Sequence, residues 1–500
     1  MGKAKRAKLK KIEEQERLEK LNAQKRAERR DTMKVAVVAV SILLVIAIVV
    51  TACCLVVFAI RSTGNYLRDR VAVTSEHYDV NNAMMSYFFH DTFNSSKSYY
   101  DAYASYIGLN TSMPLRDQTN SQTGQSWYKY FMDGTVENVK SMLVLAEAAK
   151  AAGVELTDIE NARIDEAIDN LAKYAELSKV STEKFIHETY GLGVKEGDVR
   201  DALKIYFLSQ KFYYQTLSGI EVTTEEINKH YEENTDDYMI LDYKVYSFKD
   251  TEKKVLPAVR KGELLAEAKT PEQFDEILRD LIAVDFTDED KLDAAIKGTL
   301  KEGVTLVEKQ EYSKWLFEDG RKVGDTKVIK ADDGTVSVYM LVTEPHRDES
   351  ATKDVRHILF SFSNYESKEE CKAAAEAVLK KFKEDGASEE KFAELAALYS
   401  TDSGSSSNGG LYENVAEGQM VEPFEKWLFD DSRKVGDCDI VETTYGYHIM
   451  YYVGEGRPQW EASIFEELRS DKLSEISKEF TKKYPINVDS NRLNNIPDVA

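Results

Sequence analysis

Three short stretches in the last third of the chain carry the residues best suited to chemistry. His357 lies in the stretch 355–359, and His448 lies in a second stretch, 443–450, together with Thr443. Between them, Asp402 occupies a loop rich in serine and glycine. These residue types exchange hydrogen bonds near neutral pH. Taken singly, each has a plainer role, because a buried histidine commonly completes a core and an aspartate in such a loop caps a turn.

The histidines give no indication of a metal or a cofactor. None of the seven histidines is paired at ligand spacing, and the pattern H-x-x-x-H does not occur in the sequence. The sequence also has no P-loop and no GxGxxG segment ahead of a helix. We therefore expect neither a metal site nor a cofactor, and a hydrolase or metalloenzyme is disfavoured.

One unit of the sequence occurs twice, near 238–345 and 352–455. Residues 312–325 and 424–437 are identical at 10 of 14 positions, at an offset of 112. Each copy reads as strand, helix, helix, long loop, short helix, strand and strand. This order predicts two small α+β domains in tandem.

In their order and spacing, the three stretches resemble the parvulin family of peptidyl-prolyl cis/trans isomerases. The resemblance covers the whole second copy, residues 350–456. It implies that His357 and His448 lie on adjacent central strands beneath the active site and that Asp402 faces the substrate amide. It further implies that Thr443 belongs to the same hydrogen-bond network.

The resemblance also implies an apolar pocket for the proline ring, formed by Leu411, Met420 and Phe424, with Tyr445 beside it. On the residues alone, Met420 and Phe424 would be core residues in any domain. Rotation about an amide bond faces a barrier of about 18–20 kcal/mol, and a dry pocket favours the less polar twisted amide. Such catalysis needs no nucleophile, so the histidines would tune hydrogen bonding and shape more than transfer protons.

Two features of the second copy depart from the family. The residues after Leu411 are Tyr412, Glu413 and Asn414, which would make one pocket wall polar. The loop 361–364 lacks a basic cluster, so we do not expect a phosphorylated substrate.

The first copy, 238–346, resembles the same family without its site. At the position of His357 this copy has Tyr243, and at that of His448 it has Val336 or Ser337, depending on register. At the position of Asp402 it has Val284 or Asp285, and at that of Met420 it has Glu308. An acidic side chain in the pocket should repel an apolar ring. We expect a structural or client-binding role for this copy.

Residues 35–60 carry no charge and predict a transmembrane helix. A helix of this length exceeds the roughly 30 Å hydrocarbon core of a bilayer. Residues 1–34 hold 13 basic and 6 acidic residues, which predicts a cytoplasmic N-terminus and an extracytoplasmic segment 62–500 in a single-pass protein of the cell membrane. Cleavage of the segment, or lipidation at Cys53, is the less favoured alternative because the apolar run continues beyond Cys53.

Residues 61–237 predict a mainly helical lobe, rich in aromatic residues that serve either packing or client binding. Thr223 and Glu226 form a capping-box pattern ahead of a helix. An amphipathic helix in 457–500 needs a partner face, which the helical lobe would provide. The whole arrangement resembles the PrsA/SurA-type extracytoplasmic foldases, which implies an α+β protein: a helical chaperone lobe completed by the C-terminal helix, with two parvulin-like domains between.

These features together predict a membrane-anchored foldase. The net charge of −22 argues against a nucleic-acid partner. The resemblance implies a peptidyl-prolyl isomerase and chaperone for unfolded exported polypeptides with Xaa-Pro bonds, and a homodimer is left open. The alternatives are a client-binding chaperone with two inactive copies, or an envelope scaffold. Whether Cys371 and Cys438 pair is also left open.

Overall fold

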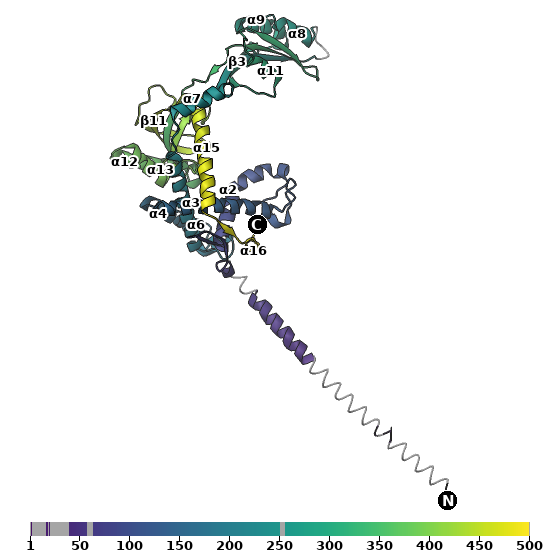
Figure 1. Ribbon diagram of the computed structural model, residues 1–500, viewed down its shortest axis with the longest axis vertical. Coiled ribbons are helices and arrows are strands. Elements are labelled where there is room, and N and C mark those ends of the chain that lie inside the picture. Colours follow the sequence, from purple (N-terminus) through teal and green to yellow (C-terminus); the bar gives the residue numbers. More distant parts are fainter. Residues whose placement is uncertain are drawn as a thin grey trace. The chain divides into compact units, whose positions relative to one another are not determined.

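The computed structural model describes Gly2, residues 17–18 and 20, and the ranges 40–57, 64–250 and 256–499 (Figure 1). The chain divides into two compact units. The first comprises Met1–Lys140, Ala167–Leu203 and Ile486–Ala500, and the second comprises Ser141–Glu166 and Lys204–Pro485. The predicted basic segment 1–34 lies almost wholly outside the described residues.

The apolar segment near the N-terminus forms a helix over Val40–Val57 (Figure 1). Its 18 residues have a mean hydropathy of 3.2, and none of them is buried against the rest of the chain. A helix this long and apolar can cross a membrane, which fits an anchor or a signal segment. The remaining residues of the predicted span 35–60 lie outside the described part of the chain.

The first unit joins both ends of the folded chain in one small sheet. The strands β1 (Val71–Thr74), β2 (Asp79–Asn81) and β12 (Asn487–Val488) lie in the order β12-β1-β2. Beside them lie 3-10 helices η1 (Asn65–Leu67) and η2 (Leu115–Asp117) and helices α2 (Asn82–Ile107), α5 (Thr182–Tyr190) and α16 (Ser490–Leu493). The limit between the units falls within α3 (Trp127–Ala151), α4 (Asp158–Leu177) and α6 (Glu196–Ser218). The last residues of the chain therefore complete the N-terminal part of the fold.

In the second unit, helix α7 (Thr224–Glu233) packs against the long helix α15 (Gln459–Lys483). The predicted capping box is confirmed, because the Thr223 side chain accepts from the Glu226 amide and the Glu226 side chain accepts from the Thr223 amide. Ile227 of α7 is buried together with Ile464 of α15. The short 3-10 helix η3 (Thr235–Tyr238) then leads into the first repeat.

The two repeats have the same sheet topology. The first has the strand order β4-β3-β6-β5, with β7 added beside β3, and the second has the order β10-β11-β8-β9. Elements of the first repeat are β3 (Met239–Phe248), α8 (Ala258–Leu265), α9 (Pro271–Ile282), η4 (Ala283–Asp285), α10 (Glu289–Lys297), β4 (Leu300–Thr305), α11 (Glu311–Leu316), β5 (Thr326–Lys330), β6 (Val336–Leu341) and β7 (His346–Arg347). Elements of the second are β8 (Lys353–Ser361), η5 (Phe362–Asn364), α12 (Lys368–Glu384), α13 (Glu389–Tyr399), η6 (Ser406–Asn408), β9 (Leu411–Val415), α14 (Glu422–Leu428), β10 (Cys438–Glu442) and β11 (Gly446–Glu455).

The sheet of the second repeat separates two apolar layers. Helices α12 and α13 cover one face, where Phe392 packs against Ile358 and Ile449, and α14 covers the other through Phe424. The segment predicted as a long loop contains the fourth strand, β9, because Val355 and Arg356 of β8 pair with Tyr412 and Leu411. Cys371 and Cys438 are both free thiols.

Candidate active site

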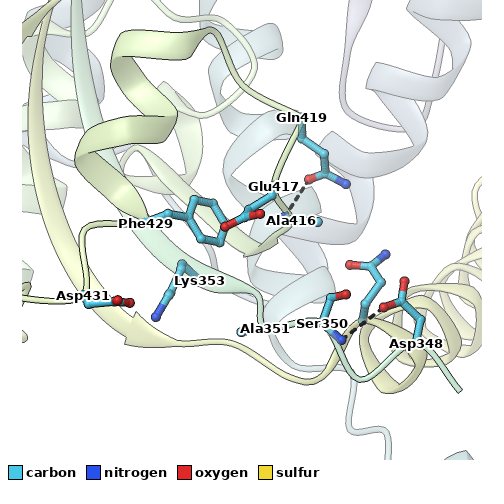
Figure 2. A pocket seen from close by; sticks show the side chains of 10 residues that line it. Asp348, Ser350, Ala351, Lys353, Ala416, Glu417, Gln419, Phe429 and Asp431 are labelled. Carbon is cyan, nitrogen blue, oxygen red and sulfur yellow. Dashed lines mark hydrogen bonds between the residues drawn. The ribbon is translucent and has the colours of Figure 1, made fainter. Parts of the chain in front are cut away.

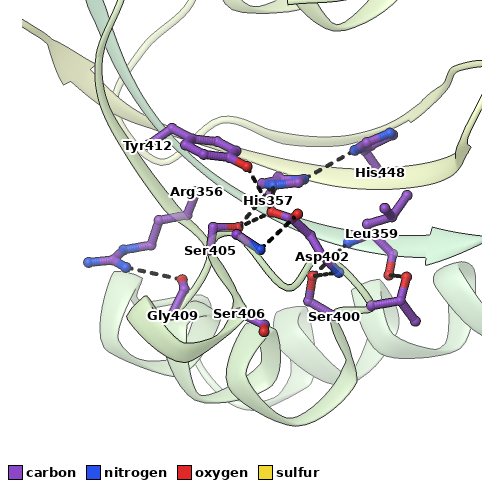
Figure 3. Close-up of polar contacts among 12 residues, drawn as sticks. Arg356, His357, Leu359, Ser400, Asp402, Ser405, Ser406, Gly409, Tyr412 and His448 are labelled. Atoms are coloured by element: carbon purple, nitrogen blue, oxygen red, sulfur yellow. Dashed lines mark hydrogen bonds and ion pairs between the residues drawn. The ribbon is translucent and has the colours of Figure 1, made fainter. Parts of the chain in front are cut away.

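The two histidines of the second repeat lie on its central antiparallel strands, β8 and β11. In the register of these strands, His448 lies opposite Leu359, and His357 lies opposite Met450. Because side chains alternate along a strand, His357 shares a face with Leu359 and hence with His448. The two Nδ1 atoms are 3.1 Å apart (Figure 3), and both histidines are buried.

Asp402 lies at the other end of His357. Its Oδ2 atom is 2.9 Å from His357 Nε2 and accepts hydrogen bonds from the Tyr412 hydroxyl, at 3.0 Å, and from the Ser405 hydroxyl (Figure 3). The amide of Gly404 donates to Oδ1 at 3.2 Å. One carboxylate thus collects four donors, a pattern that fits the ionised form.

Thr443 closes the opposite end of the network. Its hydroxyl lies 2.9 Å from His448 Nε2. With Asp402 ionised as an acceptor, the donor count assigns one direction when both rings are neutral: Thr443 donates to His448 Nε2, His448 Nδ1 donates to His357 Nδ1, and His357 Nε2 donates to Asp402. Every ring nitrogen then has a partner.

Burial and hydrogen bonding together set the protonation states of Asp402, His448 and Tyr412. Burial alone would raise the pKa of Asp402, but the hydrogen bonds from His357 and Ser405 outweigh it and hold that pKa below its usual range. Burial, reinforced by His357, lowers the pKa of His448 to about 3. Burial and the charge of Asp402 raise the pKa of Tyr412 to about 12. Near neutral pH the site therefore holds a carboxylate, a neutral His448 and a phenol.

We expect acid to destabilise the second repeat through His448. Its pKa is about 3 in the fold and about 6.5 in an unfolded chain, so the unfolded state binds more protons throughout that window. The free energy of unfolding should fall by up to about 1.4 kcal/mol per pH unit as the pH drops from about 6.5. Asp402 adds to this loss at lower pH, because its folded pKa also lies below its unfolded value.

Amide hydrogen exchange in β8 and β11 would measure this pH dependence, after correction for the intrinsic effect of pH on exchange. His448→Gln removes the titrating ring and should flatten the profile between about pH 6.5 and 4. A profile equally steep in this variant would contradict the assignment.

Two aromatic rings, those of Phe424 and Tyr412, contact the imidazoles of the site. The Phe424 ring meets His357 and His448 edge-on, with centroids 5.5 and 5.6 Å away. The Tyr412 ring stacks on His357 at 5.2 Å. Phe424 is almost completely buried, so its contact with the histidines fixes the orientation of both rings.

The other predicted pocket residues lie at differing depths. Leu411 begins β9 and is half-buried, and Met420 packs against the apolar cluster that contains Phe424. Tyr445 has 62% of its side chain exposed, and its backbone amide donates to the Thr443 hydroxyl. The structure thus brings His357, His448, Asp402, Thr443 and Phe424 into one network, while the roles of Leu411, Met420 and Tyr445 stay predictions.

Hydrogen bonds to its backbone anchor the loop that carries Asp402. His357 N donates to the Gly410 carbonyl at 2.8 Å, and Gly410 N donates to the Ser405 carbonyl at 2.8 Å. Arg356 Nη1 donates to the carbonyls of Asn408 and Gly409, at 3.0 Å each. Figure 3 shows the contact with Gly409. The polar end of the network therefore depends on a tightly anchored turn.

Two members of the network were not predicted as site residues. Ser405 is buried and lies 3.1 Å from His357 Nε2, and Tyr412 stands where the sequence departs from the family pattern. Their signal in the sequence is weak, because Ser405 is one of several serines in the loop and the side of β9 that Tyr412 faces depends on its register.

In the first repeat, three tyrosines occupy the corresponding positions. Tyr243 replaces His357 and Tyr312 replaces Phe424, and in the strand register Tyr339 lies opposite Val245, as His448 lies opposite Leu359. The prediction of Val336 or Ser337 at this position was wrong, because the ungapped alignment misses the shift between the final strands. Tyr312 and Tyr339 stack with centroids 4.7 Å apart, so the site is filled by phenol rings.

A separate cavity of about 610 Å³ opens on the second repeat (Figure 2). Lys353, Gln419 and Phe429 line it, and the Gln419 side chain accepts from the Ala416 amide. It holds none of the predicted catalytic residues. Gln419 lines this cavity, whereas its neighbour Met420 packs against the apolar cluster that contains Phe424. The two side chains therefore point to different sites.

The sequence of the second repeat matches a known domain family. Residues 338–454 match the family of the PPIC-type PPIASE domain. The predicted parvulin-type domain is thereby confirmed in the second repeat.

Relatives of the chain are foldase proteins of the PrsA type. It is 47% identical over 64 residues to Foldase protein PrsA 1 of Listeria innocua, which covers 13% of this chain and 22% of the relative. Identity to Foldase protein PrsA of Bacillus subtilis is 39% over 106 residues, covering 21% and 32%. Identity to Foldase protein PrsA of Caldanaerobacter subterraneus is 28% over 196 residues, covering 38% and 57%. The alignments thus span less than two thirds of each relative.

Among solved structures, the crystal structure of PrsA from Bacillus subtilis aligns with 18% identity and a TM-score of 0.23, covering 75% of this chain and 96% of that one. A SurA-like chaperone of Campylobacter jejuni aligns with 15% identity and a TM-score of 0.16, covering 66% and 84%.

Proposed function

We propose that the chain is a peptidyl-prolyl cis/trans isomerase joined to a holding chaperone. It would be anchored by one helix with its N-terminus in the cytoplasm, and would act on unfolded exported polypeptides at the outer face of the cell membrane. The observation that carries the proposal is the buried network of His448, His357 and Asp402 against Phe424, in a domain that matches the PPIC-type family.

The network supports rotation of an amide through its electrostatics. A planar amide gains its double-bond character from a resonance form with negative charge on oxygen. A carboxylate that faces the substrate carbonyl disfavours that form and so favours the twisted amide. Each 1.4 kcal/mol of such selective stabilisation raises the rate about tenfold. In this proposal Asp402 supplies the charge, and the two histidines hold Asp402 and the pocket in place.

The histidines are suited to positioning because their ring nitrogens are already occupied. Both nitrogens of His357 contact protein groups, and His448 is neutral and buried. A proton need not move at any stage, since isomerisation breaks no covalent bond. The proline ring would lie on the apolar side of the site, against Met420 and Leu411.

The first test is prolyl isomerisation by the full chain in detergent on a panel of Xaa-Pro tetrapeptides. We expect catalysis above the uncatalysed rate and a fall of about tenfold in kcat/KM for Met420→Ala, because the proline ring loses apolar contact. Val421→Ala is the matched control, since Val421 packs against the same cluster. Equal falls in both variants would assign the loss to packing, and no catalysis by the parent chain would refute the isomerase.

The first repeat has a different role in this proposal. Its three tyrosines provide neither a carboxylate nor an imidazole at the positions that correspond to the network of the second repeat. Residues 238–346 therefore serve a structural or client-binding function. A homodimer is also part of the proposal, and sedimentation of the chain in detergent would test it.

A further inference from the structure

Tyrosine side chains cluster on the surface of the first unit, on helices α2 and α3. Four of them are largely exposed: Tyr99 at 63%, Tyr103 at 50%, Tyr106 at 88% and Tyr130 at 44%. Tyr100 is half-buried beside them. We name these five residues the tyrosine surface.

The tyrosine surface is a continuous feature of two helices. Tyr99, Tyr103 and Tyr106 are spaced four and three residues apart on α2, which places them on one helical face. Tyr99 and Tyr103 are in ring contact at 4.8 Å, and Tyr99 also touches Tyr100 at 5.6 Å. Tyr130 of α3 joins through Phe131, which packs against Tyr100 at 5.1 Å.

A groove of about 460 Å³ lies at one side of the tyrosine surface, where Tyr100 and Tyr130 line it. Aromatic rings give it apolar walls, and Thr92 and Asn138 add side chains that can hydrogen-bond. Asp133 and Glu137 also line it, and each is paired with a lysine of α3. Exposed large side chains gathered on one face of a soluble domain commonly mark an interaction site. The exposed tyrosine rings are therefore available to a binding partner, whereas Phe131 is buried and packs inside the protein.

Three lysines on the helices that carry the tyrosine surface form ion pairs. Each has a carboxylate partner on its own helix, within 2.7–2.9 Å: Lys97 with Asp101, Lys129 with Asp133, and Lys140 with Glu137. A surface whose lysines are paired in this way attracts neither an anionic lipid headgroup nor a strongly charged peptide. A lysine that binds an anionic lipid must have a charge that no neighbouring carboxylate neutralises. The partner that fits is an uncharged one.

We infer that the tyrosine surface binds extended, uncharged polypeptide segments rich in apolar and aromatic side chains. Tyrosine rings stack on such side chains at a low cost in conformational entropy, and their hydroxyls hydrogen-bond to the exposed backbone of an extended chain. Recognition is thereby independent of any particular sequence. This inference rests on the proposed function, since it assigns the place where the chaperone holds its clients.

The test uses the full chain in nanodiscs of neutral lipid and a fluorescent, uncharged peptide that contains phenylalanine and leucine but no proline. Fluorescence anisotropy should show saturable binding, with a Kd that changes less than about twofold on added salt. The triple variant Tyr99→Ser, Tyr103→Ser, Tyr106→Ser should raise the Kd at least about tenfold. Binding that is unchanged in the triple variant would overturn the inference.

A matched control comes from α4 of the same helical region, where Tyr174 and Leu177 are exposed at 46% and 70%. The double variant Tyr174→Ser, Leu177→Ser should bind the peptide as the parent does. Weakening equal to that of the triple variant would make the binding a general effect of surface apolarity and refute the assignment to α2.

Two further readouts separate the alternatives. Hydrogen exchange in α2 should slow when peptide is added; slowing on transfer from detergent to nanodiscs without peptide would identify a lipid-binding surface and overturn the inference. The triple variant should isomerise tetrapeptides at the parental rate. A chain that binds the peptide without catalysing would refute the isomerase alone, whereas one that catalyses without binding would refute this inference alone.

Discussion

Replacing Asp402 by alanine should lower kcat/KM for Xaa-Pro isomerisation by on the order of a hundredfold, the effect typical of removing one preorganised electrostatic group. The carboxylate is the only charged acceptor that His357 Nε2, Ser405 and Tyr412 share among the described residues, so its loss leaves three donors without a common partner. The substrate amide would also lose the negative charge that opposes its planar form. Isomerisation of tetrapeptides by the full chain measures the effect.

Asp402→Asn separates charge from shape. The amide oxygen of asparagine can still accept from His357, but it carries no charge. If the charge acts on the substrate, this variant should be nearly as slow as the alanine variant. Parental activity in Asp402→Asn would show that the network works through geometry alone, and would contradict the electrostatic role proposed for the carboxylate.

The control for these variants is Asp439→Ala, in the same domain. Asp439 accepts hydrogen bonds from Trp427 and Arg433, and 58% of its side chain is exposed. Its removal should leave catalysis within about twofold of the parent, because surface ion pairs contribute little. A comparable loss in Asp439→Ala would indicate a general sensitivity of the domain to lost carboxylates.

The prediction of the fold depended on the repeat. A pair of similar segments identified two domains, and the family resemblance placed His357 and His448 on adjacent central strands. The fourth strand was missed, because 411–415 is short and its middle residues are polar, so only its pairing with β8 makes it a strand. Long-range pairing of this kind leaves little trace in a local pattern.

The prediction of the site was limited by register and by loop geometry. The family resemblance singled out Asp402, but Ser405 reaches it only because the loop turns back within three residues. In the first repeat, Tyr339 was missed since the alignment near the last strand slips, and a slip of one residue moves a side chain to the opposite face. The sequence thus predicted the central residues of the hydrogen-bond network better than it predicted their hydrogen-bond partners.

A second large effect is expected at Gly410, beneath the Asp402 loop. Gly410→Ala should lower the free energy of unfolding of the second repeat by about 3 kcal/mol, from the cost of left-handed backbone together with overpacking. Gly410 has a φ of +75°, and a Cβ atom there would lie 2.3 Å from the His357 carbonyl oxygen. Neither backbone can yield freely, because His357 N donates to the Gly410 carbonyl.

Gly418→Ala is the matched control, because Gly418 has a similar φ of +84° but open space around the added Cβ. It should cost only about 1–2 kcal/mol, the left-handed penalty alone. Hydrogen exchange of β8 and β11 would measure both free energies, and tetrapeptide isomerisation should fall further in Gly410→Ala, since that turn positions Asp402. Equal destabilisation by the two substitutions would mean that backbone strain, and not the close approach of the Asp402 loop to β8, determines the stability of this site.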